Sequence, residues 1–191
     1  MSGGTFEITT QHLILRSIDP MDAPRIQSFL QEKEIAANAR SIPYPYPPGT
    51  AEQWIENQLR AISNGEACVI AITRKSDALL SDSDRCRPLI GVAGLAIDNE
   101  HHHAELGYWV GKPYWGKGVC TEAAGALIRY GFEQIGLHRI HAHYLARNPA
   151  SGRVLEKIGM TREGLFRQHV RKWGCFEDVV FYGMLASDQN A

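Results

Sequence analysis

The chain has 191 residues, of which 44% are hydrophobic and 21% are charged, a composition typical of a folded globular domain and unlike a disordered chain. Twenty basic and 21 acidic residues leave a formal net charge of −1, so the overall charge does not favour a nucleic-acid or anionic-membrane partner. No apolar run approaches a membrane span, no signal peptide is apparent, and the four cysteines lack Cys-x-x-Cys spacing. We therefore expect one cytoplasmic domain over residues 1–191, with reduced thiols and without a zinc site.

The N-terminal part of the chain predicts a strand followed by a helix. Residues 6–18 are apolar and rich in β-formers, which favours a strand ending at Arg16. Residues 19–22, Asp-Pro-Met-Asp, then offer the side chains preferred at a helix start. The apolar stripe of this helix fades before Asn38.

A proline-rich segment over residues 41–49 separates this helix from the next. Its prolines exclude both a helix and a central strand. It is either a stiff linker or a wall that holds Tyr44 and Tyr46 over a substrate pocket. Thr50 and Gln53 have capping-box spacing, which predicts that a second helix opens here and runs to an Asn-Gly pair.

The middle of the chain predicts three strands, over residues 67–73, 89–97 and 104–110. Residues 74–87 between the first two are strongly polar, and we expect a mobile hairpin connection there. Residues 98–103 form the next turn and end in three successive histidines. Adjacent side chains point in different directions, so we expect an exposed turn rather than a metal site.

The second half of the chain predicts two helices and three strands. The helices cover residues 119–135 and 149–158, and the strands cover residues 138–145, 160–171 and 176–185. Asn148 and Pro149 are the residue types preferred at an N-cap and at the first helical position. The element order is β-α-α-β-β-β-α-β-α-β-β, which indicates one mixed α/β domain.

A glycine-containing loop over residues 111–118 joins a strand directly to a helix. Its glycines let backbone N–H groups approach a ligand, and the helix adds free N–H groups and the positive end of its dipole. Lys112 and Lys117 add positive charge. The loop therefore predicts an anionic ligand. It is neither a P-loop, because a glycine follows Lys117, nor a dinucleotide fingerprint, because residue 121 is not glycine.

Several short motifs occur in a fixed order along nearly the whole chain. They are Leu13–Arg16, Ile42–Tyr46, Glu105–Trp109, Trp115–Gly118 with Thr121–Ala123, Arg147–Ser151, Glu156–Met160 and Lys172–Gly174. Together with the element order, they resemble the GNAT superfamily of acetyl-CoA-dependent N-acetyltransferases, and most closely its RimJ/RimL branch of ribosomal-protein N-terminal acetyltransferases. The resemblance implies an α/β (α+β) fold. Its mixed, mostly antiparallel sheet is splayed between the fourth and fifth expected strands (104–110 and 138–145) and flanked by helices.

The resemblance also implies where acetyl-CoA binds. The family's pyrophosphate loop falls on residues 115–120, where Gly118 matches the pattern, whereas Trp115 and Cys120 depart from it. The pantetheine arm would pair with the strand edge at residues 108–110. Asn148 matches a family asparagine that holds this arm, although the same residue suits a helix cap. The implied cofactor residues are Tyr108, Trp109, Val110, Trp115, Gly116, Lys117, Gly118, Val119, Cys120, Thr121, Asn148, Ser151 and Arg153.

The catalytic assignments follow from the same resemblance. Many family members have a tyrosine acid where this chain has Leu155, so Ser151, one turn earlier, is the substitute, unless its hydroxyl only bonds to the helix backbone. Glu105 is the first candidate for the base, unless it pairs with an arginine. His169 and Glu163 are reserves. The expected substrate-binding residues are Tyr44, Tyr46, Glu105 and His169. Direct transfer needs no acyl-enzyme on Cys120 and no metal.

The expected function is acetyl transfer to a primary amine, foremost a protein N-terminal α-amine. One alternative is a small-molecule acceptor such as a polyamine, aminoglycoside or amino acid, for which the acidic segment 77–84 is the only hint of a cationic substrate. Another is a sensor that binds acetyl-CoA without turnover. A homodimer would follow the family's habit, and the partners are acetyl-CoA and the acceptor, not nucleic acid or membrane.

Overall fold

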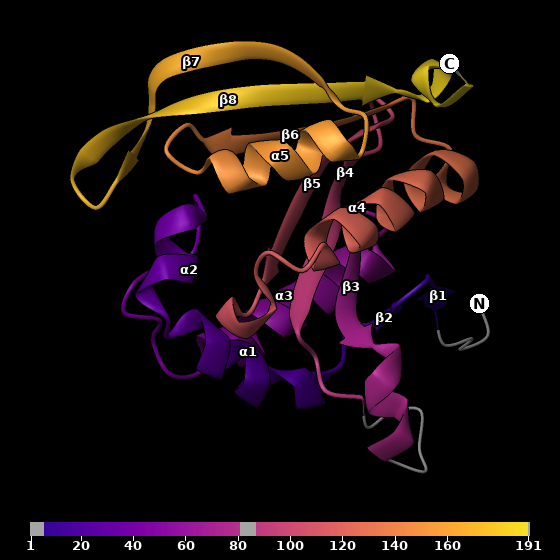
Figure 1. The fold of residues 1–191 in the computed structure, drawn as a ribbon, viewed down its shortest axis with the longest axis vertical. Helices are drawn as coiled ribbons and strands as arrows, with labels where there is room; N and C mark the ends of the chain where they lie inside the picture. Colours follow the sequence, from indigo (N-terminus) through magenta and orange to yellow (C-terminus); the bar gives the residue numbers. More distant parts are fainter. Residues whose placement is uncertain (1–5, 81–86, 191) are drawn as a thin grey trace.

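Eight strands form one twisted sheet in the computed structural model, which describes residues 6–80 and 87–190 (Figure 1). The strands are β1 (Glu7–Thr9), β2 (Leu13–Ser17), β3 (Ala67–Arg74), β4 (Gly91–Asp98), β5 (His103–Val110), β6 (Arg139–Leu145), β7 (Thr161–Lys172) and β8 (Cys175–Leu185). Their order across the sheet is β1-β2-β3-β4-β5-β6-β8-β7. Every neighbouring pair is antiparallel except β5 and β6, which are parallel. The mostly antiparallel mixed sheet is therefore confirmed.

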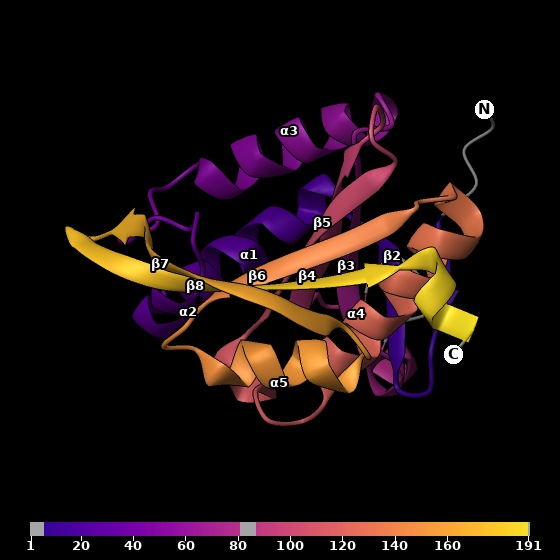
Figure 2. The same cartoon turned by 90° about the horizontal axis from the view of Figure 1, so that it is seen from above.

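Helices cover both faces of this sheet (Figure 2). One face carries α1 (Ala23–Leu30), α2 (Lys33–Asn38) and α3 (Thr50–Ser63), and the other carries α4 (Val119–Tyr130) and α5 (Pro149–Lys157). Because strand side chains alternate between faces, each face buries its own apolar cluster. The α4 side includes Leu95, Leu106 and Leu127, whereas the α1–α3 side includes Ile26 and Ile55.

The N-terminal strand prediction is wrong in one respect, because residues 6–18 form a hairpin rather than one strand. β1 pairs with β2, and Glu7 lies opposite Arg16. The turn between them is held from a distance by Glu122 of α4, which accepts hydrogen bonds from the Thr10 hydroxyl (2.6 Å) and the His12 N–H (2.7 Å). A side chain over a hundred residues away stabilises this turn.

The following helices also differ in detail from the expectation. A capping box of Asp19 and Asp22 does open the first helical segment, as predicted. That segment ends at Leu30, however, and α2 forms separately before residue 39. The capping box predicted at Thr50 is wrong: Gly49 is the N-cap with φ +80°, no side chain caps this end, and Thr50 is the first helical residue.

Most of the remaining elements match their predictions within a few residues. Residues 41–49 contain neither helix nor strand, and β7 and β8 join through the predicted turn, in which Trp173 (φ +50°) and Gly174 (φ +87°) are both left-handed. In the 74–87 connection, residues 75–80 form a short 3₁₀ segment, and the rest of that predicted mobile loop, 81–86, lies outside the described residues. Among the described helices, none is long and apolar enough to cross a bilayer.

The predicted splay lies between β5 and β6. These strands pair only over 103–105 and 139–141, after which they diverge (Figure 1). The second half of β5 therefore keeps one paired edge, toward β4, and presents the other edge to a gap. Because a strand edge without a neighbour offers free N–H and C=O groups, the gap is a place where an extended ligand can bind.

Candidate active site

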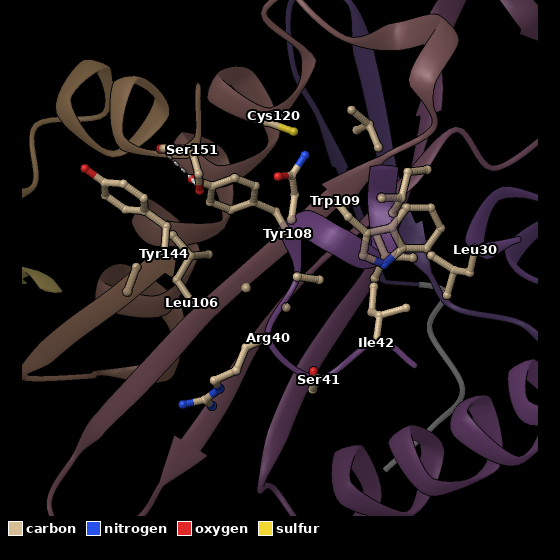
Figure 3. A pocket seen from close by; sticks show the side chains of 18 of the residues that line it. Leu30, Arg40, Ser41, Ile42, Leu106, Tyr108, Trp109, Cys120, Tyr144 and Ser151 are labelled. Atoms are coloured by element: carbon tan, nitrogen blue, oxygen red, sulfur yellow. Dashed lines mark hydrogen bonds between the residues drawn. The ribbon is translucent and has the colours of Figure 1, made fainter. Parts of the chain in front are cut away.

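A cavity of about 650 Å³ opens at the gap between β5 and β6 (Figure 3). Residues from both faces of the sheet line it, so the gap connects the α4–α5 side with the α1–α3 side. Successive side chains along β5 point to opposite faces of the sheet, so each residue contacts only one side of the cavity. Tyr108 packs with the α4–α5 cluster, whereas Trp109 packs with the α1–α3 cluster. Glu105 and Gly107 have the same parity as Trp109 and therefore face the α1–α3 side.

The free edge of β5 presents backbone donors to the cavity. Gly111 donates its N–H to the Ile90 carbonyl (2.9 Å), toward β4. Because backbone N–H groups alternate in direction along a strand, those of the odd-numbered residues point toward β4 and those of the even-numbered residues point away from it. The N–H groups of Tyr108 and Val110 consequently point away from β4 and into the gap. The Val110 carbonyl already accepts the indole N–H of Trp115 (2.9 Å), and this bond ties the glycine loop to the strand end.

The glycine loop leads into α4 with the geometry expected of an anion site. Gly116 (φ +72°) and Gly118 (φ +77°) are left-handed, a conformation that favours glycine, and Gly118 is the N-cap of α4 without a side-chain cap. The first N–H groups of the helix thus lack intrahelical acceptors, and the loop that precedes them, residues 115–118, is exposed. The positive charge is less than predicted, because Lys112 pairs with Glu34 (2.6 Å) of α2.

Asn148 lies at the other wall of the cavity, at the start of α5. It is the N-cap residue by position, but its side chain makes no capping hydrogen bond. Asn148 lines the cavity instead, and a carboxamide can both donate to and accept from a ligand. The side chain of Asn148 therefore does not cap α5, although the sequence left that role open.

Two hydroxyl groups meet on the α4–α5 side of the gap. Tyr108 donates its hydroxyl proton to the backbone carbonyl of Ser151 (3.0 Å), and its oxygen lies 3.0 Å from the Ser151 hydroxyl (Figure 3). Because the tyrosine proton is already used, the Ser151 hydroxyl is the donor in the second bond. Burial raises the pKa of Tyr108, and it raises the pKa of the nearby Cys120 thiol to about 12. Both groups are therefore protonated at neutral pH, and Cys120 is a poor nucleophile.

Glu105 is the carboxylate of the α1–α3 side of the cavity. Its Oε1 accepts a hydrogen bond from Arg40 (3.3 Å), so the arginine partner that the sequence left open is present, with Arg40 and Glu105 side chains 45% and 38% exposed. The same oxygen lies 3.6 Å from Nδ1 of His143, whose side chain is only 8% exposed. Burial lowers the pKa of His143, and the Glu105 charge opposes that shift. A neutral imidazole therefore lies beside this carboxylate, just beyond hydrogen-bond distance.

The cavity brings together about half of the site residues proposed from the sequence. The cavity lining includes Tyr46, Glu105, Tyr108, Trp109, Val110, Trp115, Cys120, Asn148 and Ser151. The remaining candidates, Tyr44, Gly116, Lys117, Gly118, Val119, Thr121, Arg153 and His169, are not part of that lining. Six of these eight lie on the glycine loop, the start of α4 or the exposed surface of α5, so their role in cofactor binding stays a prediction.

Two substrate-binding candidates lie elsewhere on the surface. Tyr44 is 40% exposed and packs on Trp173 at the β7–β8 turn, with 5.8 Å between ring centroids. His169 is exposed on β7 and packs edge-on against Phe166 and Phe181. The reserve base Glu163 forms an ion pair with Arg139 and does not line the cavity.

The sequence reasoning missed Arg40, His143 and Tyr144, all of which line the cavity. For His143 there was a usable signal. In the predicted strand 138–145 the apolar Ile140 and Ala142 alternate with histidines, which places the histidines together on the opposite face. Arg40 follows a helix end in an irregular segment, where no periodicity indicates its direction.

The sequence is similar to a known family and to several proteins of that family. A family model described as an acetyltransferase (GNAT) domain matches residues 12–161. An uncharacterized N-acetyltransferase of Bacillus subtilis, YnaD, is 42% identical over 184 residues, covering 96% of this chain and 99% of its own. The ribosomal protein uS5-alanine N-acetyltransferase of Escherichia coli is 28% identical over 188 residues, covering 95% and 91%.

Solved structures agree on the fold. A probable acetyltransferase of 25% identity superposes with a TM-score of 0.80 over 96% of this chain and 98% of its own. RimL, a ribosomal L7/L12 α-N-protein acetyltransferase solved with coenzyme A, is 19% identical with a TM-score of 0.82 over 94% and 98%, a likeness in fold alone. With the family match spanning most of the sequence, the chain belongs to the GNAT family and is a GNAT N-acetyltransferase.

Proposed function

We propose that this enzyme transfers the acetyl group of acetyl-CoA to the α-amine of a protein or peptide N-terminus, by direct attack in a ternary complex. The observation that carries the proposal is the divergence of β5 from β6. This divergence opens one cavity, and both the backbone donors and hydroxyls of the α4–α5 side and the carboxylate of the α1–α3 side line it. Two reactants entering from opposite faces of the sheet would meet there.

The α4–α5 side fits acetyl-CoA. The free N–H groups at the start of α4 suit the pyrophosphate, and the N–H groups of Tyr108 and Val110 suit the amides of the extended pantetheine arm. The unbonded carboxamide of Asn148 faces the same space. Two solved structures of similar fold contain acetyl-CoA and coenzyme A, respectively, which supports acetyl-CoA as the ligand.

The reaction needs one proton acceptor and one proton donor. The amine nitrogen forms a bond to the acetyl carbon, the C–S bond breaks, and the electron pair leaves on the coenzyme A sulfur. Glu105, assisted by the neutral imidazole of His143, accepts the amine proton. The hydroxyl pair of Ser151 and Tyr108 donates a proton to the departing thiolate, and a backbone N–H in the gap polarises the carbonyl.

Charge distribution favours an α-amine over a polycation. Among the described residues, Glu105 is the only carboxylate in the cavity lining, and Arg40 forms an ion pair with it. Of the acidic segment that hinted at a cationic substrate, the described Asp77 is not part of the cavity lining and forms an ion pair with Arg74 (2.8 Å) at the end of β3. Residues 81–84 of that segment lie outside the described residues. An α-amine titrates near 8, so a carboxylate and an imidazole suffice to deprotonate it. The E. coli relative is named as an N-acetyltransferase for an alanine of ribosomal protein uS5.

The test is release of free thiol from acetyl-CoA with a panel of acceptors: N-terminal peptides that differ at the first residue, spermidine, an aminoglycoside and free amino acids. We expect turnover with peptides. Turnover confined to a small amine would replace the proposed substrate but keep the reaction, and binding of acetyl-CoA without any turnover would indicate a sensor. Mass spectrometry of the peptide product identifies the acetylated nitrogen.

A further inference from the structure

The α1–α3 side of the cavity has a floor without side chains. Gly94 of β4 lies directly opposite Gly107 of β5, and residues opposite each other on antiparallel strands share a face. Both glycines line the cavity. Neither has a left-handed φ, and a Cβ added at Gly107 would have no atom within 4 Å, so backbone strain does not explain the glycine there. At Gly94 an added Cβ would meet the Val69 side chain at 3.2 Å, so the hollow in the sheet surface lies over Gly107.

This hollow has a polar end and an apolar end. The pair on one flank is Ala96 with Glu105, and the pair on the other is Val92 with Trp109. At about 3.3 Å per residue, the Cα atoms of Glu105 and Trp109 are about 13 Å apart along β5. An amine held at Glu105 therefore has room for a substituent that runs over Gly107 toward Trp109.

Apolar side chains enclose the far end of the hollow. Leu30 of α1, Ile42 of the proline-rich segment and Trp109 converge there (Figure 3). The other apolar and aromatic residues of the cavity lining on this side are Ile26, Ile35, Tyr46, Trp54, Val69 and Val92. Within this part of the described structure the lining contains no charged side chain, whereas Arg40 and Glu105 stand at the opposite end. Desolvation at the apolar end would penalise a charged or polar substituent.

We propose that this hollow is a subsite for a large apolar first residue, so that peptides beginning with leucine, methionine or phenylalanine are preferred over those beginning with alanine, serine or glycine. The inference rests on the proposed function, because it places the acceptor α-amine at Glu105. The α-carbon then lies over Gly107, and its side chain fills the space enclosed by Leu30, Ile42 and Trp109.

The size of the preference follows from the surface that the side chain buries. Leucine has three more carbon atoms than alanine, and each fully buried methylene is worth about fourfold in kcat/KM, or about 60-fold for all three. Incomplete burial at an open cavity reduces that figure. We therefore expect kcat/KM for a leucine-first peptide to exceed that for the matched alanine-first peptide by about 30-fold or more.

Gly107→Val tests the subsite, because its methyl groups enter the hollow without meeting another atom at Cβ. The leucine-to-alanine ratio of kcat/KM should fall at least tenfold. Gly164→Val in β7 is the matched control: it is also a strand glycine, outside the cavity lining, and its Cβ would meet only Phe166 at an ordinary 3.6 Å. The control should keep the wild-type ratio. Acetyl-CoA affinity, measured for both variants, reports whether the fold and the cofactor side are intact.

A second variant tests the apolar end by charge. Ile42→Asp, in an irregular segment, should lower kcat/KM for the leucine-first peptide and raise it for a lysine-first peptide relative to wild type. Equal kcat/KM for leucine- and alanine-first peptides in the wild type, or an unchanged ratio in Gly107→Val, would overturn the subsite while leaving N-terminal acetylation in place. Absence of turnover with every peptide would overturn the proposed function itself.

Discussion

Replacing Glu105 by glutamine separates its role as a proton acceptor from its role in an ion pair. Glutamine has nearly the same shape and can still accept a hydrogen bond from Arg40, but it cannot take the amine proton. Loss of a positioned base costs about 10²–10⁴-fold in rate. His143 lies 3.6 Å from the same oxygen and remains as a weaker acceptor, so we expect the low end, about 100-fold in kcat at pH 7.

The same geometry limits the side effects of the substitution. The Arg40 and Glu105 side chains are 45% and 38% exposed, so losing their ion pair should change the free energy of unfolding by about 1 kcal/mol or less. Glu105 faces the α1–α3 side, whereas the proposed cofactor groups face α4 and α5. Acetyl-CoA affinity should therefore stay within about twofold, roughly 0.4 kcal/mol.

The assay is thiol release at saturating acetyl-CoA from pH 6 to pH 10, with kcat and KM for the acceptor at each pH. Arg40→Gln is the control, because it removes the same ion pair and keeps the carboxylate. Glu105→Gln should lose far more kcat than Arg40→Gln, and part of the loss should return at high pH, where more amine is already deprotonated. Equal losses in the two variants, or a Glu105→Gln rate within threefold of wild type, would refute the assignment of Glu105 as the base.

Three further predictions concern the cofactor side and the pH response. Gly118→Glu places a side chain on a left-handed residue (φ +77°) and a negative charge at the start of α4, so acetyl-CoA affinity measured by calorimetry should fall at least 100-fold; unchanged affinity would disprove the loop assignment. Ser151→Ala and Tyr108→Phe each break the bond between the two hydroxyls, so each should lower kcat about tenfold with recovery at high pH, and the double variant should lose no more than the larger single loss; additive losses would show that the two act separately. Burial lowers the pKa of both His141 and His143 below the ordinary 6.5, so the unfolded chain binds more protons in acid; the stabilisation is complete above pH 6.5 and is lost as pH falls through the folded-state pKa. The melting temperature should therefore drop below pH 6.5, and less steeply in His143→Gln; a flat profile for wild type would contradict the shifts.

The parts of the fold that the sequence predicted well are those set by local chemistry. The strand 104–110, the glycine loop and the helix after it follow one another without a gap, and Gly118 begins the helix where the pattern placed it. The β7–β8 hairpin likewise follows from Trp173 and Gly174, whose left-handed conformations suit its turn.

The failures occur where distant residues decide the local structure. The turn after β1 contains no glycine, proline or asparagine, and it depends on the carboxylate of Glu122 in α4. The contact of Glu105 with Arg40 joins residues 65 positions apart, and neither segment alone predicts it. The faces of β5 and β6 can be read from alternation, but the convergence of Glu105 and His143 also requires the strand register.

The proline-rich segment is held in place by the last hairpin of the chain. The buried Lys172 donates from Nζ to the Ile42 carbonyl (3.1 Å), and Trp173 packs on Tyr44. The Lys172–Ile42 bond closes a loop of 130 residues, so it forms only after β7 and β8 have been synthesised and paired. The same hairpin also completes the core on the α4 side, because Val180, Tyr182 and Met184 of β8 belong to it. The last two strands therefore close the cofactor side and fix the wall over the acceptor side in one late step of synthesis. Truncation before residue 172 should accordingly impair cofactor binding as well as acceptor use.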